Sequence, residues 1–259
     1  MSNYESFPSI SVITPTWNRE TFLPYAYRSF VTQLARPIEW IVIDDSETPS
    51  PFMGNLNDPR VIYRHSPKRI SIGEKRNLAI DLARGEIIAH FDDDEIYAPD
   101  YLSTLVGKMR ESGASFAKLG AFFVYSRVYD RFGYWDLMQK SGTHFIWSPQ
   151  PMSLLELPPN HPQFVDIHFG YGFSYVYTKQ LWAANHFQPI SHSEDQPFVL
   201  AARDRGENIV LVSDTAGLCM HVQHAHNTSF SFPQYLLPTA LVAQKYPYFI
   251  QALQDMALS

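Results

Sequence analysis

The residues whose types most clearly indicate chemistry are four consecutive acids, Asp92, Asp93, Asp94 and Glu95. They follow the short apolar run 86–91, which is typical of a buried strand. Like charges this close repel one another unless a cation or hydrogen-bond donors compensate them, and carboxylate oxygens are hard ligands suited to Mg²⁺ or Mn²⁺. A solvated acidic loop is the alternative interpretation. The strand before the run and the helix start at 98–100 favour a site for a metal-bound nucleotide.

The elements that must position these acids alternate between strand and helix patterns. We expect strands at 10–14, 39–43 and 60–64 and helices at about 20–35, 73–84 and 99–112. Such alternation predicts βαβ units and a mostly parallel sheet flanked by helices. Asp45 follows the second strand, so it should lie at the same edge as the acid run, where open α/β sheets bind ligands.

The helix at 73–84 is expected to be amphipathic. Its apolar positions predict that Leu78, Ile80, Leu82 and Ala83 face the core, with Gly85 as the C-terminal cap.

The second half of the chain has a different character. Residues 116–177 are rich in aromatic side chains and contain a proline-rich stretch at 148–162, which suits a surface lid or binding loop. A helix should follow Ser193 and end at Gly206, strands are expected at 208–213 and 218–222, and residues 233–257 should be mostly helical. We expect one domain over 1–259, with a nucleotide-binding half at about 9–113, a second half at about 114–232, and a C-terminal helical segment at 233–259.

Composition excludes several classes of protein. Hydrophobic residues make up 45% of the chain and charged residues 18%, as in globular domains. A net charge of −6 argues against a nucleic-acid-binding protein. The single cysteine, Cys219, excludes an internal disulfide. We see no signal peptide and no apolar run near the ~20 residues of a membrane span, so we expect a soluble, cytoplasmic protein whose C-terminal helix could still touch a membrane or a partner chain.

Several short motifs together resemble family 2 glycosyltransferases of the GT-A fold, over roughly residues 9–229. They are VITPTWNR at 12–19, EWIVIDDS at 39–46, GEKRNLA at 73–79, GEI at 85–87, DDDEIYAPDYL at 92–102, ED at 194–195 and QHAHNTS at 223–229. Each is weak alone, but their order and spacing match the family.

The resemblance implies a donor site and a metal site. The donor-binding positions are Thr14, Asn18, Asp45, Arg76, Asp92 and Asp93. Asp45 would accept a hydrogen bond from the base of a UDP-linked donor, and Arg76 could pair with Asp45 or reach the base and diphosphate. Asp94 would be the direct ligand of Mn²⁺ or Mg²⁺, and His224, the second metal residue, would lie near the diphosphate or on the ion. Whether His221 or His226 joins it stays open.

The resemblance also implies a catalytic pair. Asp195 would be the base that takes the proton of the acceptor hydroxyl, and Glu194 would orient it or hold the acceptor. The alternative is ordinary capping of a helix start, where acids are favoured. The family's usual glycine-rich lead-in is replaced by NHFQ at 185–188, which puts the local loop shape in doubt.

The aromatic segment overlaps the family's variable acceptor region. Trp147 and Tyr171 are therefore candidates to stack on an acceptor, although core packing is an equally good interpretation.

The function implied is an inverting, metal-dependent transfer of a sugar from a nucleotide diphosphate donor to an acceptor hydroxyl. The acceptor could be a sugar, a lipid-linked molecule or a protein. A metal-dependent phosphohydrolase and a non-catalytic nucleotide-sugar-binding protein are the alternatives.

Overall fold

The architecture is described from a computed structural model, which defines residues 7–148, 151–159, 161–225, 227 and 230–257. The strands are β1 Ile10–Thr16, β2 Glu39–Asp44, β3 Val61–His65, β4 Ile87–His90, β5 Ile96–Tyr97, β6 Phe116–Ser126, β7 Arg131–Asp136, β8 Gly142–Ile146, β9 Ser153–Leu157, β10 Val176–Thr178, β11 Ile209–Ser213, β12 Cys219–Gln223 and β13 Tyr235–Leu237. The helices are α1 Leu23–Val31, α2 Pro51–Asn55, α3 Ile72–Leu82, α4 Tyr101–Ser112, α5 Lys179–Ala184, α6 Asp195–Asp204, α7 Thr239–Lys245 and α8 Pro247–Ala257, with short 3₁₀ turns η1 Pro162–Phe164, η2 Ile167–Phe169 and η3 Gly172–Ser174.

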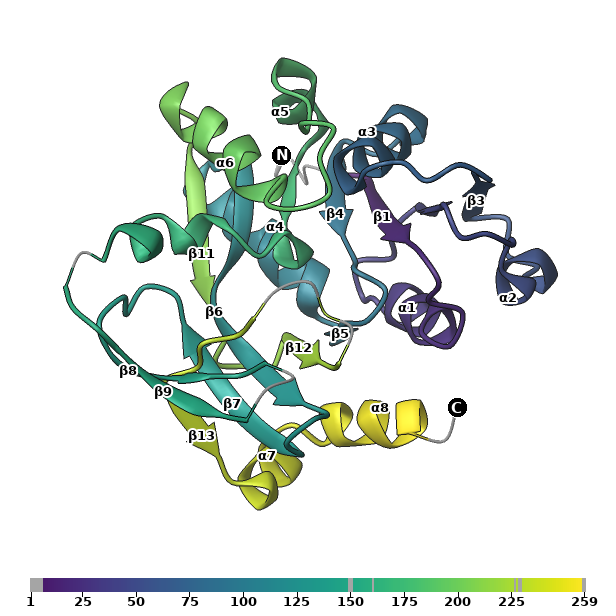
Figure 1. Cartoon of the computed structure of the whole chain (residues 1–259). Helices are drawn as coiled ribbons and strands as arrows, with labels where there is room; N and C mark the ends of the chain where they lie inside the picture. The colour runs from purple at the N-terminus through teal and green to yellow at the C-terminus, as the bar shows by residue number, and fades with distance from the viewer. Residues whose placement is uncertain (1–6, 149–150, 160, 226, 228–229, 258–259) are drawn as a thin grey trace, which may run out of the picture.

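One large sheet organises the chain (Figure 1), with the main strand order β13-β7-β6-β10-β4-β1-β2-β3. The strands β4, β1, β2 and β3 are parallel, as expected from the alternating pattern. The sheet as a whole is mixed, because β10 runs antiparallel to both β4 and β6, and β7 runs antiparallel to β6. The long strand β6 also pairs in parallel with β11 and then with β12, which curls the sheet around the site.

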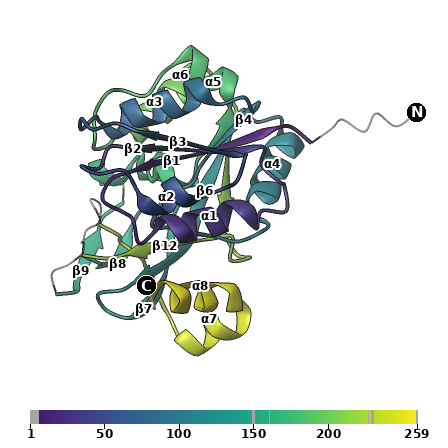
Figure 2. The same ribbon diagram turned by 90° about the vertical axis from the view of Figure 1, so that its right-hand side faces the viewer.

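Helices cover both faces of the parallel part of the sheet (Figure 2): α3, α5 and α6 lie on one face and α1, α2 and α4 on the other. This follows from the alternation of side chains along a strand. In β1, Val12 packs in the core cluster of α1 and α4, whereas the next residue, Ile13, packs in the cluster of α3, α5 and α6.

Helix α1 is shorter than the sequence suggests. It keeps Pro24 in its first turn, as expected, but ends at Val31 instead of continuing to about residue 35. Arg36 has a left-handed backbone (φ 49°) and precedes Pro37, and neither feature is compatible with a continuing helix.

Two expectations for α3 are wrong. Leu78 and Leu82 are 47% and 37% exposed, and the buried face instead carries Lys75 and Arg76 beside Ala79 and Ile80. Gly85 does not cap the helix, which ends at Leu82. A Cβ on Gly85 would lie 2.6 Å from the backbone nitrogen of Ser11, so this glycine permits close packing against β1.

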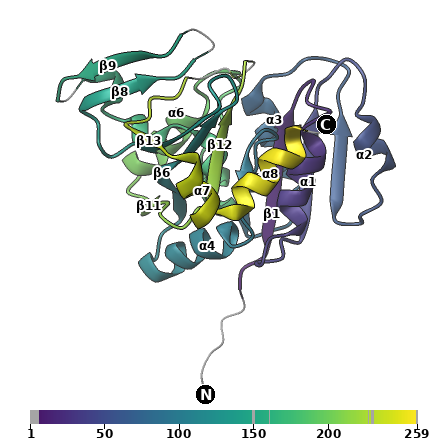
Figure 3. The same cartoon turned by 90° about the horizontal axis from the view of Figure 1, so that it is seen from below.

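The C-terminal segment packs beneath the curled end of the sheet and beside α1 (Figure 3). Val242 of α7 and Phe249 of α8 join a core cluster with Met220 of β12. The Tyr25 hydroxyl donates to the carbonyl of Asp255 at 2.6 Å, which fastens α8 to α1. None of the helices in the described part of the chain has the length and apolar character that crossing a membrane requires.

Candidate active site

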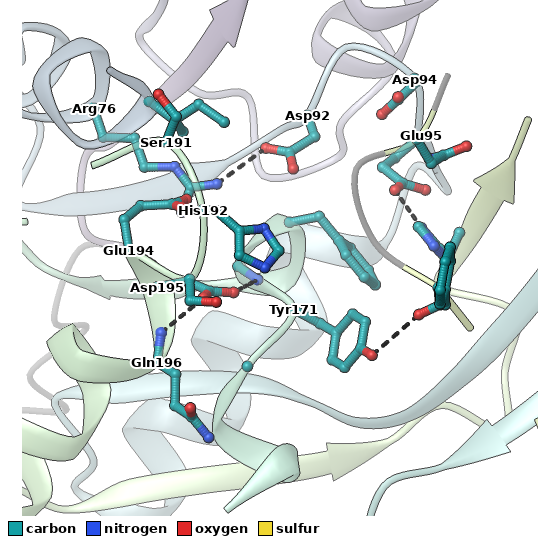
Figure 4. A pocket seen from close by; sticks show the side chains of 18 of the residues that line it. Arg76, Asp92, Asp94, Glu95, Tyr171, Ser191, His192, Glu194, Asp195 and Gln196 are labelled. Atoms are coloured by element: carbon teal, nitrogen blue, oxygen red, sulfur yellow. Dashed lines mark hydrogen bonds and ion pairs between the residues drawn. The ribbon is translucent and has the colours of Figure 1, made fainter. Parts of the chain in front are cut away.

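A pocket of about 540 Å³ opens at the edge where β4 ends (Figure 4). Arg76, Glu194 and Asp195 lie on one side of it, and Asp94 and Glu95 lie on the opposite side. Its lining brings together Arg19, Ile72, Arg76, Asp92, Asp94, Glu95, Ile167, Gly170, Tyr171, Gly172, Phe173, Ser191, His192, Ser193, Glu194, Asp195, Gln196, His221, Asn227, Phe230 and Phe232. The two acidic motifs that lie a hundred residues apart in the sequence therefore share one cavity.

The loop after β4 is turned towards the pocket by Tyr97. Its buried hydroxyl accepts from the backbone N–H of Asp92 at 3.0 Å and donates to the carbonyl of Phe173 at 2.8 Å. Its ring stacks on Phe91 with 3.9 Å between centroids. Tyr97 thus joins the acid run to Phe173, another residue of the pocket lining.

The acids of the run have different roles in the fold. Asp92 lines the pocket, and burial raises its pKa to about 6 against the opposing effect of Arg76. Asp93 is buried, accepts from the Thr16 hydroxyl at 2.5 Å and is not among the lining residues of the pocket. Burial and the neighbouring Asp94 charge raise the pKa of Asp93. Of the two, only Asp92 is placed to meet a ligand.

Asp94 lies beside His224, with 3.0 Å between Oδ2 and Nε2, and 3.7 Å from the Arg19 guanidinium. Burial alone would oppose ionisation, but His224 and Arg19 together lower the pKa of Asp94. The His224 ring is held from the other side by stacking on Phe22 at 5.3 Å. His226, the second histidine of this motif, lies outside the described residues.

The chemistry of this pair fits a divalent cation. Asp94 Oδ2 and His224 Nε2 lie 3.0 Å apart, and a carboxylate oxygen and an imidazole nitrogen are both ligands that divalent cations take. The described residues contain no group of three or more His, Cys, Asp or Glu side chains arranged around one ion. An ion at this pair would therefore take its remaining ligands from a bound substrate or from water, as Mg²⁺ commonly does.

Arg76 was expected to pair with Asp45 or to reach the donor, and in the structure its ion-pair partners are Glu194 and Asp92. It is buried and lies 3.2 Å from Glu194 and 3.6 Å from Asp92, and it does not pair with Asp45. Burial disfavours the charged form, but the two carboxylates outweigh it and raise the pKa of Arg76. Its Nε and Nη1 atoms and Oδ1 of Asp92 are buried without a hydrogen-bond partner among the described residues.

Lys75 pairs with Asp45 in place of Arg76, although no feature of the sequence singles out this lysine. Its ammonium lies 2.7 Å from Asp45 Oδ1 and also donates to the carbonyl of Thr16. Arg69 and the backbone N–H of Ile70 donate to Asp45 as well. Both carboxylate oxygens of Asp45 are therefore occupied by these donors, and its side chain is fully buried.

Thr14 and Asn18 are not among the residues that line the 540 Å³ pocket. Thr14 is fully buried, donates to the carbonyl of Phe91 and accepts from Trp40 Nε1, so it cannot contact a ligand directly, and the donor-binding expectation for it is corrected. Asn18 has a left-handed backbone (φ 53°) and lines a smaller cavity of about 200 Å³ next to the pocket, between the ends of β1 and β2.

The Glu194–Asp195 pair stands at the start of α6, as expected. Glu194 makes no capping hydrogen bond, because its carboxylate is turned to Arg76. Asp195 accepts from the N–H of Gln196 and from the N–H of Gly172, each at 2.8 Å. Capping therefore does not account for Glu194, and Asp195 is held by two backbone donors at the pocket surface.

Helix α3 also holds the loop that leads to this pair. The Asn77 side chain donates to the carbonyl of Phe187 and accepts from the N–H of the same residue and from Trp182 Nε1. The N–H of Gly73 donates to the carbonyl of Ile190, and a Cβ on Gly73 would fall 1.8 Å from the carbonyl oxygen of Gln188. The sequence NHFQ at 185–188 is thus fixed by α3 without the glycines that the family resemblance implies.

His221 and Glu95 form a second pair in the pocket. His221 Nδ1 contacts Glu95 Oε1, and Glu95 Oε2 accepts from the N–H of Val222 at 2.9 Å. Burial raises the pKa of Glu95 to about 7. Burial by itself lowers the pKa of His221, but the adjacent Glu95 raises it overall. No sequence motif marks the pair, because its members are 126 residues apart.

The two aromatic residues considered for acceptor binding, Trp147 and Tyr171, lie in different surroundings. Trp147 is fully buried, its Nε1 points to Met152 Sδ, and a Cβ on Gly133 would lie 2.9 Å from its ring, so the acceptor expectation for it is corrected. Tyr171 lines the pocket with an unusual left-handed backbone (φ 65°). Phe230 and Phe232, which lie outside the aromatic segment 116–177, belong to the same pocket lining.

Comparison with known proteins agrees with this architecture. The family model described as "Glycosyl transferase family 2" matches residues 11–181. A Campylobacter jejuni protein named GalNAc(5)-diNAcBac-PP-undecaprenol beta-1,3-glucosyltransferase is 36% identical over 113 residues, which are 41% of this chain and 36% of that protein. Glycosyltransferase GlyG of Streptococcus pneumoniae is 28% identical over 122 residues, 45% of this chain and 40% of that protein. The matched segment spans less than half the length of these relatives.

A solved structure, S. aureus TarS 1-349 in complex with UDP-GlcNAc, superposes with a TM-score of 0.60 at 20% identity. The match covers 85% of this chain and 60% of that one. At this identity the similarity shows a common fold.

Proposed function

Because the chain belongs to glycosyl transferase family 2, we propose that it is an inverting, metal-dependent glycosyltransferase that uses a UDP-linked sugar. The observation that carries the proposal is the placement of the two acidic motifs, with Asp94, whose carboxylate contacts His224 behind the pocket lining, on one side of the pocket and Asp195 on the other. A donor bound between them would have its diphosphate at the first motif and its anomeric carbon facing the second.

The balance of charge in the pocket supports the metal. Its lining contains five carboxyl groups, two guanidinium groups and two histidines. A nucleotide diphosphate would be repelled by this excess of acids unless a cation accompanied it. A divalent ion held by Asp94 and His224 would neutralise the charge that develops on the departing diphosphate.

Side chains of the protein would remove the acceptor proton and position the reacting groups. Asp195, fixed by the N–H groups of Gly172 and Gln196, would take the proton from an acceptor hydroxyl. The acceptor oxygen bonds to the anomeric carbon as the bond from that carbon to the diphosphate breaks, and UDP leaves. Because attack and departure occur on opposite faces, the anomeric configuration inverts. Arg76, which also lines the pocket, would hold Glu194 and Asp92 in place through its two ion pairs.

The donor assignment rests on the family and on the fold. TarS, which shares the fold, is described in complexes with UDP and with UDP-GlcNAc. For this chain we expect UDP to bind more tightly than GDP, ADP or dTDP. The acceptor side, bordered by Tyr171, Phe230 and Phe232, suits the C–H face of a sugar, and we leave open whether that sugar is free, lipid-linked or attached to protein.

The experiment is a thermal-shift series with the four nucleotide diphosphates, with Mn²⁺, with Mg²⁺ and with EDTA, because a ligand of the native state raises the melting temperature. We expect a shift with UDP that depends on the metal. Release of UDP from UDP-sugars is then measured with and without saccharide acceptors. Hydrolysis that no acceptor stimulates would support the phosphohydrolase instead, and binding without any turnover would support a non-catalytic protein.

A further inference from the structure

One nitrogen in the pocket has no assigned role. His221 lines the cavity and is only 3% exposed, and its Nε2 atom has no hydrogen-bond partner among the described residues. Buried polar atoms are nearly always paired, and an unpaired one in a native site calls for an explanation. Leaving such an atom unsatisfied is costly, so a ligand atom that pairs with it would gain affinity.

The ring is held so that this nitrogen keeps one direction. Glu95 contacts Nδ1, and its second oxygen is itself fixed by the N–H of Val222. One ring face lies flat on Phe173, with 5.2 Å between centroids and 6° between planes. Phe122 approaches at 6.2 Å with its plane almost perpendicular. The imidazole therefore cannot turn without breaking these contacts, so its orientation in the wall of the pocket is fixed.

The protonation state of His221 Nε2 and the rings around it indicate which kind of ligand atom would pair with this nitrogen. A metal ion needs Nε2 without a proton, and a phosphate oxygen needs it with one. A hydroxyl group can donate or accept, so it fits Nε2 in either state. Flat aromatic rings around one polar edge also suit a sugar, which offers apolar C–H faces and hydroxyl groups at its rim.

The position of His221 indicates which sugar. His221 contacts Glu95, which is next to the proposed metal ligand Asp94 in sequence. It also contacts Phe173, which is next to the glycine that holds the proposed base. In the reaction proposed above, the group that lies between the metal and the base is the sugar being transferred.

We propose that His221, oriented by Glu95, binds a hydroxyl group of the transferred sugar through Nε2 and thereby contributes to selection of the donor sugar. This inference rests on the proposed function, and it adds a binding contact that the donor motifs do not contain.

The test compares the contribution of the sugar with that of the nucleotide. Dissociation constants are measured by calorimetry for UDP, UDP-glucose, UDP-galactose and UDP-N-acetylglucosamine, each with Mn²⁺, for the wild type and His221→Phe. Phenylalanine keeps the stacking on Phe173 and removes both ring nitrogens. In His221→Phe the buried Glu95 carboxylate loses its partner, which could destabilise the fold. The double variant Glu95→Gln/His221→Phe removes that charge, and the glutamine oxygen can still accept from the N–H of Val222. The double variant therefore tests the contact even if the single variant misfolds.

The matched control is His168→Phe. His168 also carries an unpaired buried nitrogen, Nδ1, but is not among the pocket-lining residues, and its backbone carbonyl remains available to Lys118. The same chemical change is thus made outside the site.

For both His221 variants we expect UDP affinity within about twofold of wild type and a roughly 3–10-fold loss for the preferred UDP-sugar, the range of one neutral hydrogen bond. The control should change neither. Equal losses for UDP and UDP-sugar would overturn the inference and assign His221 to the metal or diphosphate. Unchanged affinities, or a wild type that binds UDP and UDP-sugars equally well, would also overturn it while the proposed function stands. A wild type that binds no nucleotide with metal would refute the proposed function itself, and the inference with it.

Discussion

The backbone N–H of Gly172 donates to Oδ2 of Asp195 over 2.8 Å, and this bond joins the aromatic wall of the pocket to the start of α6. Gly172 has no side chain at a point where one could not fit. A Cβ there would lie 2.6 Å from Arg76 Nη1 and 2.9 Å from the Cβ of Asp195. The proposed base and the buried arginine can approach each other only because residue 172 is a glycine.

Gly172→Ala should therefore displace Arg76 or Asp195. We expect sugar transfer to fall by at least about tenfold, since small misplacements of reacting groups are costly, together with a lower melting temperature from overpacking. Gly170→Ala is the matched control, because its Cβ would meet only the carbonyl of Ile167 at 3.4 Å. Steady-state transfer and thermal melts of both variants check this, and equal effects of the two changes would contradict it.

Asp195→Asn should reduce transfer by roughly 10²–10⁴-fold, the usual contribution of general-base catalysis. Binding of UDP and Mn²⁺ should stay near wild type, because Asp195 lies on the side of the pocket opposite Asp94. Glu194→Gln should have a smaller effect, since it leaves Arg76 paired with Asp92. Transfer assays and calorimetry separate the roles. Should Glu194→Gln abolish transfer while Asp195→Asn retains it, the two assignments are reversed.

Asp94→Asn should remove most of the Mn²⁺-dependent affinity for UDP, because it deletes one of the two proposed protein ligands. Asp93→Asn is its neighbour in sequence but changes a side chain that bonds to Thr16 and does not line the pocket. We expect the second variant to retain metal-dependent binding in the same thermal-shift assay. If Asp93→Asn lost metal-dependent UDP binding and Asp94→Asn retained it, the metal ligand would be Asp93 and not Asp94.

Lys118 provides a prediction for the pH dependence of stability. Its side chain is fully buried on β6, where the ammonium donates to the carbonyl of His168, and burial lowers its pKa to about 7, with Asp195 acting weakly in the opposite direction. Between this pKa and the ordinary value near 10.5 the unfolded chain binds more protons than the native one, so the free energy of unfolding rises with pH through this group.

Lys118→Met removes that contribution at nearly constant volume. Relative to wild type, the variant should gain most in free energy of unfolding at or below pH 7. The gain should shrink by up to about 1.4 kcal/mol per pH unit above it. Urea denaturation of both proteins at pH 6, 7, 8 and 9 measures this difference, in which the other titrating groups largely cancel. A difference that does not vary with pH would show that Lys118 is not neutral in the native protein.

The sequence by itself was sufficient for the parallel half of the sheet and for the acids at its edge. The apolar run before Asp92 is a local signal, and the structure agrees with it, because β4 ends just before the acids. The helix expected at about 99–112 is observed as α4, which ends at Ser112 before Gly113 in the left-handed conformation. The position of Glu194 and Asp195 at a helix start was equally predictable from their neighbours.

Only the tertiary structure decided which of these side chains meet. Lys75 rather than Arg76 pairs with Asp45, because α3 turns a polar face inward and leaves Leu78 exposed. Glu95 contacts His221, 126 residues away in the sequence, because β5, which directly follows the acid run, pairs with β12, which contains His221. Trp147 is buried and Tyr171 lines the pocket, although both lie in one aromatic segment. Residue type and spacing fix what a side chain can do, but partners distant in sequence depend on how the strands curl and pair, and no local pattern encodes that.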